Sequence, residues 1–281
     1  MSDNPNTSLS ISIVCYNSPI QELRNALRSL ISALAKLKLA GQVASSTIFL
    51  VDNSDEHRLE LNAFAEFDEE LSAIGSELRL IKGQGNIGYG SAHNLVIHDT
   101  EADYHLLLNP DVELAEDCLQ RGVAYLEDNR QVAVVSPHAT NGDGHKQHLC
   151  KRYPSVLTFA VRGFFPAWLK RLFYKRLARF EMHDLDEAHP CDGITIVSGC
   201  FMLCRSDLLK QVGGFDEKYF MYFEDFDLSL RLAKNGRLTY LPAMKIKHHG
   251  GHSAGKGVRH IGMFVKSGFR FFNTYGWRFI R

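Results

Sequence analysis

Apolar residues along the chain alternate between short continuous runs and longer stretches at helical spacing. The run 9–15 (LSISIVC) is rich in β-branched residues and predicts a buried strand. After Pro19, apolar positions recur at helical spacing as far as Gly41, which predicts an amphipathic helix. The next run, 46–51 (STIFLV), predicts a second strand that leads directly into Asp52. A strand, a helix and a strand with polar residues at its end are typical of the start of a parallel, nucleotide-binding sheet.

The same order of elements continues through the rest of the chain. A glycine-rich turn at 83–90 and a helix from Ser91 to about His98 separate two further strands. The remaining predicted strands end in polar residues, and the carboxyl ends of parallel strands form the edge of a sheet at which ligands bind. We therefore expect one large α/β core with a soft subdivision near Pro137. The further strands are predicted at 78–81, 104–108, 132–136, 194–203 and, as a short one, 244–247.

Composition and charge narrow the class of protein. The chain has 45% hydrophobic and 23% charged residues, which is ordinary for a globular protein. Lys plus Arg and Asp plus Glu both number 32, so no overall field favours a nucleic-acid partner. The six cysteines form no CxxC pair, and several lie in apolar runs, which indicates a reducing cytoplasm. Because no run approaches the ~18 apolar residues of a spanning helix, we expect a protein that is neither exported nor integral to a membrane.

Two polar segments at predicted strand ends can bind a nucleotide. The carboxylate of Asp52 can accept a hydrogen bond from a pyrimidine N–H, and Tyr16 and Asn17 offer an aromatic face and backbone groups to the same base. An Asx turn that only ends the strand is the alternative for Asp52. The glycines of 83–90 let the backbone approach a ligand, and amides at the start of the following helix can meet phosphate, although such turns also occur in ordinary loops.

Oxygen and nitrogen ligands for a divalent cation follow two other strands. Asn109-Pro110-Asp111 supplies the oxygen ligands that a hard cation bridging two phosphates prefers. Since an amide replaces one carboxylate, we expect Asp111 to do most of the binding; a plain Asn-Pro turn is the alternative. His248 can add a nitrogen ligand for a Mn-like ion, and His249 would take its place if the register slips.

Three acids, Glu224, Asp225 and Asp227, lie at the start of an amphipathic helix. Acids at this position favour the helix dipole, so a capping role is the simple interpretation. The aromatic residues just before them, however, would desolvate a carboxylate and raise its basicity, as a general base requires. We expect Asp227 to orient the helix.

These segments occur in the order found in family 2 glycosyltransferases, which the chain resembles over about 10–253. The resemblance is closest to the rhamnosyltransferase-like branch, whose members build bacterial surface polysaccharide such as O-antigen. It implies a GT-A fold: an α/β domain with a Rossmann-like, mostly parallel central sheet flanked by helices, here with a helical, basic and aromatic C-terminal part. The segments are SIVCYN, VDNSD, GNIGYGSAHN, LLLNPDV, SGCFML, GGFDEKYFMYFEDFDLSLRL and KHHGGHS.

The resemblance also implies roles for individual residues. Asp225 would be the general base that deprotonates an acceptor hydroxyl, with Glu224 as the second candidate and as an acceptor-binding residue beside Gly199 and Cys200. A divalent metal, Mg²⁺ or Mn²⁺, would be held by Asp111 and His248. The nucleotide sugar would be bound by Tyr16, Asn17, Asp52, Asn53, Asn86, Gly88, Asn94, Asn109, Asp111, Lys256 and Arg259.

We therefore predict a metal-dependent, inverting glycosyltransferase. Its donor would be a nucleotide-diphosphate sugar, with dTDP-rhamnose as the best guess, and its acceptor a glycan or a polyprenyl-diphosphate-linked sugar. The expected organisation is a flexible tail at 1–9, a glycosyltransferase domain at 10–255 and a basic aromatic segment at 256–281. The domain would comprise a nucleotide-binding half at about 10–136 and an acceptor-binding half at about 137–255. A homodimer is left open.

Two stretches mix aromatic and basic residues, 151–180 and 264–281. This mixture suits the interface of a membrane, so we expect a cytoplasmic protein that can attach to the inner face of the cytoplasmic membrane. Packing of these aromatics against the core or a partner subunit is the alternative.

Two other functions are weighed against transfer. A catalytically inactive protein that binds sugar nucleotides or polysaccharide could share this fold, and the missing carboxylate at Asn109 favours it. A nucleotidyltransferase would carry a basic glycine-rich loop directly after the first strand, whereas CYNSPIQ follows here.

Overall fold

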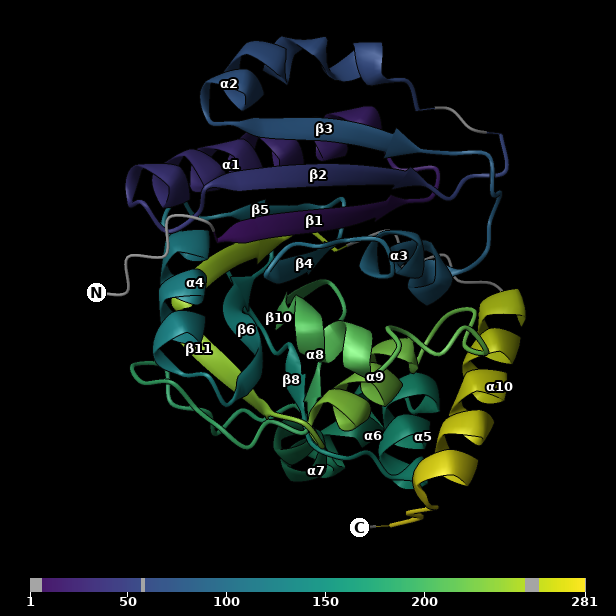
Figure 1. Cartoon of the computed structure of the whole chain (residues 1–281). Coiled ribbons are helices and arrows are strands. Elements are labelled where there is room, and N and C mark those ends of the chain that lie inside the picture. Colours follow the sequence, from purple (N-terminus) through teal and green to yellow (C-terminus); the bar gives the residue numbers. More distant parts are fainter. Residues whose placement is uncertain (1–6, 57–58, 251–257, 281) are drawn as a thin grey trace.

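The computed structural model describes residues 7–56, 59–250 and 258–280. Across these residues one large mixed sheet runs through the molecule in the order β3-β2-β1-β4-β10-β6-β11-β5, with β7 paired to β6 (Figure 1). The β3 edge lies at one end of the molecule, and the helices α5, α6, α7 and α10 lie at the other (Figure 1). The predicted α/β class and central sheet are confirmed.

The first half of the sheet is parallel, as the sequence predicted. β1 (Ser8–Cys15) lies between β2 (Ser45–Asp52) and β4 (Tyr104–Leu108), and β3 (Ser76–Ile81) pairs with the outer side of β2. Nearly every residue of β1 and β4 is buried, because helices cover both faces of the sheet.

Helices pack on the two faces of this parallel half. On one face lie α1 (Ile20–Leu39) and α4 (Cys118–Asp128), and on the other lies α3 (Tyr89–Ile97). The apolar stripe of α1, with Leu23, Leu27 and Leu30 fully buried, joins the main core cluster. A 3-10 helix (Leu61–Phe67) and α2 (Asp68–Ala73) pack beside β3.

The second half of the sheet contains antiparallel pairs that hydrophobic periodicity did not predict. β10 (Phe201–Arg205) runs antiparallel to both β4 and β6 (Val132–Thr140), and β5 (Val112–Leu114) runs antiparallel to β11 (Arg237–His248). β11 and β6 are parallel to each other. The sheet is thus parallel mainly where strand and helix alternate, and the later strands change direction.

Two strand predictions need correction. The run 194–203 forms two strands, β9 (Ile196–Val197) and β10, separated by a short turn. The strand expected at 244–247 is the end of the longer β11, whose pairing with β6 shifts register between Leu241 and Lys245. Pro242 lies in this interval and has no N–H for the ladder, so the apolar pattern of a continuous strand is interrupted there.

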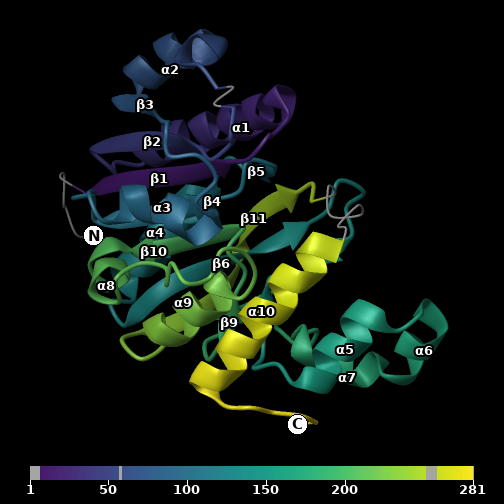
Figure 2. The ribbon, with the colours of Figure 1, turned by 90° about the vertical axis from the view of Figure 1, so that its right-hand side faces the viewer.

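The remaining helices form a second, aromatic core. α5 (Val156–Phe164), α6 (Ala167–Leu172) and α7 (Tyr174–Phe180) form one group (Figure 2). α10 (Val258–Tyr275) packs against α5 and α9 (Glu224–Leu232) through ring contacts. Phe159, Phe223 and Phe271 lie at the centre of this cluster. α8 (Ser206–Gln211) follows β10. Among the helices that the structure describes, none is long and apolar enough to cross a membrane.

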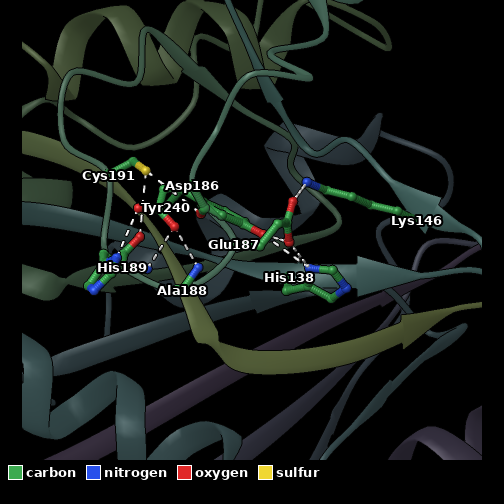
Figure 3. A network of polar contacts seen from close by, with 8 residues as sticks. All are labelled: His138, Lys146, Asp186, Glu187, Ala188, His189, Cys191 and Tyr240. Carbon is green, nitrogen blue, oxygen red and sulfur yellow. Dashed lines mark hydrogen bonds and ion pairs between the residues drawn. The ribbon is translucent and has the colours of Figure 1, made fainter.

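A polar network fixes the irregular segment 181–195 to the sheet (Figure 3). Glu187 accepts hydrogen bonds from Lys146 of β7 (Lys146–Gln147) and from the hydroxyl of Tyr240, and its Oε2 lies 2.9 Å from Nδ1 of His138. Asp186 accepts from the amide of Ala188, which tightens the same turn. β8 (Cys150–Lys151) pairs with β9 beside this segment.

Candidate active site

The polar ends of β1, β2 and β4 meet at one edge of the sheet, because these strands are parallel neighbours. The amide of Asn53 donates to the Cys15 carbonyl at 2.8 Å, and the amide of Asn17 donates to Ser54 Oγ at 2.9 Å. Asn17 adopts a left-handed conformation (φ 49°), which turns the chain away from the sheet. Tyr16 beside it is 46% exposed, so its ring is available at this edge.

Asp52 is enclosed by its own loop. Its Oδ1 accepts from the amide of Ser54 at 3.1 Å, and its Oδ2 accepts from the amide of Leu59 at 3.1 Å. The residue has no exposed surface. These contacts are those of the Asx-turn alternative, and contact with a nucleotide base would require the loop to open. The role of Asp52 as the reader of the base stays a prediction.

The glycine-rich turn is tied to two other parts of the chain. Asn53 donates to Asn86 Oδ1 and to the Gly88 carbonyl, and its own Oδ1 accepts from the amide of Ile87. At Gly88 (φ 94°), a Cβ would lie 2.5 Å from the Phe220 carbonyl oxygen, so only glycine allows this approach. The turn thus lies against the loop that leads into α9.

Asn94 has a structural role in this arrangement. Its amide group donates to the Phe215 carbonyl at 2.9 Å and accepts from the Phe215 amide at 2.8 Å. The residue is buried, and these bonds fix the 213–215 turn against α3. Asn94 therefore shapes the surroundings of the site from a buried position.

Asp111 and His248 face each other with atoms suited to a cation. His248 Nε2 lies 3.5 Å from Asp111 Oδ1, and this oxygen is buried without a hydrogen-bond partner. His248 Nδ1 lies 2.7 Å from Gln147 Oε1, which makes Nδ1 the protonated nitrogen and leaves the lone pair on Nε2. Burial lowers the pKa of His248, against the opposing effect of Asp111, so the neutral, ligand form is favoured.

His249 points to a different partner. Its Nε2 lies 2.9 Å from Glu113 Oε1, and its ring is more exposed than that of His248. The structure therefore brings His248 to Asp111 and leaves His249 on the surface. Within the described residues there is no group of three or more His, Cys, Asp or Glu side chains that could hold a metal.

Tyr89 connects the end of β4 to the turn before β10. Its hydroxyl lies 3.0 Å from Asn109 Oδ1 and 2.8 Å from the Gly199 carbonyl oxygen. The backbone N–H of Asn109 donates to the Cys200 carbonyl at 2.9 Å. Burial raises the pKa of Tyr89 well above its usual value, so the hydroxyl stays a donor. The sequence analysis missed Tyr89, although it lies between the glycines of the GNIGYG segment.

Asp225 joins the same group of residues. The amide of Gly199 donates to Asp225 Oδ2 at 3.0 Å, and a Cβ on Gly199 would lie 3.3 Å from both Asp225 Cβ and the Tyr89 ring. Asn109, Gly199, Cys200 and Asp225 therefore surround Tyr89. Residues far apart in the chain, at the ends of β4 and β9 and the start of α9, thus come together at one place.

A strained turn presents the two acids of α9. Tyr222 and Phe223 both have φ of 68°, a left-handed conformation that is costly for aromatic residues. The Phe223 ring is buried against Phe159, Phe264 and Phe271, which holds the turn in this conformation.

Glu224 and Asp225 differ in their surroundings. Burial raises the pKa of Glu224 to about 8, and the neighbouring Asp225 adds to this rise; Glu224 Oε2 has no hydrogen-bond partner. Burial also raises the pKa of Asp225, but amide bonds from Gly199 and Phe226 and the charge of Lys151 oppose that rise. The environment thus favours a proton on Glu224 over a proton on Asp225.

Lys151 is a second residue that the sequence analysis missed. It is buried in β8, where it donates to the His148 carbonyl, and burial lowers its pKa to about 8. Its charge acts on Asp225, Cys200 and Glu181. A single lysine beside an ordinary strand end gave no signal in the sequence.

Two predicted phosphate-binding side chains lie outside the described part of the structure. Lys256 lies outside the described residues. Arg259 lies in the first turn of α10, and only its backbone is described.

Two solved structures resemble the whole of this chain in fold. One is GalNAc-T7 crystallised with UDP, GalNAc and Mn²⁺, with a TM-score of 0.62 and 14% identity over 96% of this chain and 48% of that one. The other is TarS from S. aureus, with a TM-score of 0.53 and 16% identity over 95% of this chain and 73% of that one. These likenesses concern the fold, and the predicted GT-A fold is confirmed.

Two of the sequence relatives are named as rhamnosyltransferases. The N-acetylglucosaminyl-diphospho-decaprenol L-rhamnosyltransferase of Mycobacterium tuberculosis H37Rv is 28% identical over 207 residues, which are 69% of this chain and 66% of that protein. Rhamnosyltransferase WbbL of Escherichia coli K12 is 27% identical over 177 residues, 60% of this chain and 63% of WbbL. Each match thus spans slightly less than two thirds of the relative. Residues 10–213 match the profile of glycosyl transferase family 2, and since this is most of the chain, the protein belongs to that family.

Proposed function

We propose that this protein is an inverting glycosyltransferase that moves a sugar from a nucleotide-diphosphate donor to a hydroxyl group of a glycan or lipid-linked acceptor. The best candidate donor is dTDP-rhamnose, because the relatives are named as rhamnosyltransferases. The M. tuberculosis relative is also named for a diphospho-decaprenol substrate, which supports a polyprenyl-diphosphate-linked acceptor and a place in cell-surface polysaccharide synthesis.

One observation carries this proposal. A chain of hydrogen bonds runs from Asp225 through Gly199 and Tyr89 to Asn109. Asn109 lies two residues before Asp111, which faces His248. A transferase needs a base for the acceptor hydroxyl and ligands for a diphosphate within one substrate length of each other. The charges of Asp111 and Asp225 both act on Tyr89 and Cys200, as expected for groups that share one site.

In the proposed reaction, Asp225 takes the proton of the acceptor hydroxyl as its oxygen forms a bond to the anomeric carbon. The bond from that carbon to the diphosphate oxygen breaks on the opposite face, and the nucleoside diphosphate leaves with the electron pair. One displacement inverts the anomeric configuration. Glu224, protonated beside Asp225, can donate a hydrogen bond to the acceptor without competing for the proton.

The residues at the end of β4 fit a divalent metal, Mg²⁺ or Mn²⁺. Asp111 Oδ1 is a buried oxygen without a partner, and His248 Nε2 beside it carries a lone pair. These two atoms would hold the metal, with diphosphate oxygens as further ligands, and a bound metal would offset charge on the departing diphosphate. GalNAc-T7, which shares the fold, was crystallised with Mn²⁺ and UDP.

We place the nucleotide at the ends of β1 and β2. Tyr16 is the exposed aromatic surface there, and Asn17, Asn53 and Asn86 shape the edge through their hydrogen bonds. With this placement, we propose a nucleotide-binding half at about 10–136 and an acceptor-binding half at about 137–255. Lys256 and Arg259 are proposed to contact the diphosphate.

The second candidate function is a sugar-nucleotide binding protein without activity. Asn109 favours it, because the amide gives the metal no second carboxylate and its Oδ1 is already engaged by Tyr89.

Donor screening with product analysis tests the proposal and separates the two functions. We expect one nucleotide sugar, with Mn²⁺ or Mg²⁺, to yield a glycoside on a prenyl-diphosphate-linked N-acetylglucosamine acceptor, with the anomeric configuration inverted in the NMR spectrum. Tight binding of the same sugar nucleotide without transfer or hydrolysis would support the inactive protein. A product of retained configuration would contradict the proposed displacement.

A further inference from the structure

A large cavity in the described part of the chain lies away from the candidate active site. It measures about 1010 Å³ and is bounded by α5, α7, the 182–195 segment and the C-terminal residues after α10. None of Asp111, Asp225 and His248 lines it. The Glu187 network of Figure 3 holds the 182–195 wall in place.

This cavity is rich in positive charge that the protein does not neutralise. Its walls carry five cationic side chains and two carboxylates, Asp184 and Asp192. Both carboxylates are already paired, Asp184 with Arg152 at 2.7 Å and Asp192 with Arg237 at 3.0 Å. Within the described part of the chain, the other four cations form no ion pair, and an anion would therefore be attracted to them. These four are Lys175, Arg176, Arg179 and Arg278.

Two of these cations are already oriented. Arg176 donates to Ser155 Oγ at 3.2 Å, next to the start of α5, where Ser155 caps the helix. Arg278 lies over the Tyr153 ring at 4.2 Å. Both guanidinium groups thus have a contact within the protein, and guanidinium is a group that binds phosphate oxygens.

The C-terminal residues are part of the same unit. The amides of Val156 and Leu157 at the start of α5 donate to the carbonyls of Arg278 and Phe279 at 2.8 and 3.1 Å. The Tyr153 hydroxyl donates to the Gly276 carbonyl at 2.7 Å. The residues after α10 are therefore fixed beside α5 and the cavity.

Large apolar side chains of α6, of α7 and of the C-terminal residues remain exposed. Ile280 lines the cavity and is 64% exposed, and Tyr174 is the neighbour of Lys175. Phe271 and Phe272 of the same region are buried, so only some of its aromatic side chains are in contact with solvent. The exposed set is Trp168, Leu172, Tyr174, Phe279 and Ile280.

We infer that this surface binds an anionic membrane, with the phosphate of a lipid headgroup in the cavity. Unpaired cations attract the anionic surface, while the exposed tryptophan, tyrosine and leucine enter the interface between headgroups and acyl chains. A free phosphate compound would use the cations but would leave the exposed apolar side chains in water. The inference does not depend on the proposed transfer reaction.

Vesicle flotation with the full chain tests the inference. We expect binding to vesicles of phosphatidylcholine with about 30% phosphatidylglycerol and far weaker binding to phosphatidylcholine alone. Lys175→Gln with Arg179→Gln should lower partitioning roughly 30-fold, because each cation near an anionic surface contributes about a fivefold factor. Trp168→Ser with Leu172→Ser should lower it at least about 10-fold.

A matched pair serves as the control. Arg79→Gln with Arg130→Gln removes two exposed cations elsewhere, and its partitioning should stay within about twofold of the parent chain. An equal loss in the control pair, or equal binding to both kinds of vesicle, would overturn the inference.

Two further measurements identify other occupants. If inorganic diphosphate in EDTA raises the melting temperature through Lys175 and Arg179 while vesicles do not bind, the cavity is a site for a free anion and the inference is wrong. If Trp168→Ser with Leu172→Ser changes the sedimenting mass and leaves vesicle binding intact, the surface is an interface between two copies, which also overturns it.

Discussion

At the scale of single residues, the environment assigns different tasks to side chains that look alike in the sequence. Glu224 and Asp225 are neighbours, yet only Asp225 accepts an amide from Gly199. His248 and His249 are neighbours, yet only His248 faces Asp111. The sequence could nominate these residues, but burial and partners, which decide between them, depend on how distant segments pack.

Glu224→Gln should change how stability depends on pH. Since the pKa of Glu224 is about 8 in the folded chain and near its usual value in the unfolded chain, the folded state holds an extra proton between these values. The free energy of unfolding of the parent chain therefore falls as pH rises through 8. Glu224→Gln cannot lose this proton, so its free energy of unfolding does not show the same fall. Relative to the parent, the variant should gain roughly 3 kcal/mol between pH 6 and pH 9 in urea denaturation.

The control for this experiment is Glu69→Gln, at an exposed position in α2. Its stability difference from the parent should not change with pH over the same interval. A Glu224→Gln curve parallel to that of the parent would show that Glu224 is ionised at neutral pH.

His248→Ala should weaken metal binding, because it removes the ring nitrogen that lies 3.5 Å from Asp111 Oδ1. We expect Mn²⁺ affinity, measured by calorimetry with dTDP present, to fall at least about 10-fold. His249→Ala is the matched control and should stay within about twofold, since that ring faces Glu113. Equal losses in both variants would contradict the assignment.

At the scale of elements, local patterns predicted most helices and strands but not the direction of the later strands. The runs at 9–15, 46–51 and 104–108 became β1, β2 and β4 almost to the residue. The run 194–203 was split, because Gly199 and Cys200 form the turn that reaches Tyr89 and Asn109. The strand is interrupted because the turn contacts residues that are distant in the sequence. The periodicity of apolar residues does not predict such contacts.

Gly88→Ala should separate two elements of the site. A methyl group at φ 94° would collide with the Phe220 carbonyl and displace the loop before α9. We expect a loss of roughly 3 kcal/mol in the free energy of unfolding and a parallel loss of transfer activity. Denaturation in urea measures the first effect.

Gly85→Ala is the control for this substitution. Its backbone also has a positive φ (65°), but no atom lies within 4 Å of the added carbon. Its cost should be about 1 kcal/mol, from the backbone alone. Equal costs at the two glycines would show that the contact with Phe220 is unimportant.

At the scale of the whole molecule, α10 connects the C-terminal residues to the active site. Its Phe271 packs on Phe223, and Phe223 belongs to the strained turn that presents Glu224 and Asp225. The sequence predicted a helical, aromatic C-terminal part but not this contact, which joins residues 48 positions apart in the chain. The candidate site thus depends on a second core as well as on the sheet.

Phe271→Ala should destabilise the protein by about 3–5 kcal/mol, because it leaves a cavity in this aromatic core. Transfer activity should fall more than donor binding, since the turn before α9 loses its support. Phe269→Ala, at a position that is 59% exposed in the same helix, should cost less than about 1 kcal/mol. A similar small cost for both would contradict the role of the aromatic core.

The most direct test of the central claim compares Asp225→Asn with the parent chain in one preparation, measuring both glycosyl transfer and nucleotide-diphosphate binding. If Asp225 is the base in a site whose nucleotide contacts lie elsewhere, transfer should fall at least about 1000-fold. The dissociation constant of the nucleotide should change by less than about threefold. Turnover above about a tenth of the parent rate, or loss of binding together with activity, would contradict the account.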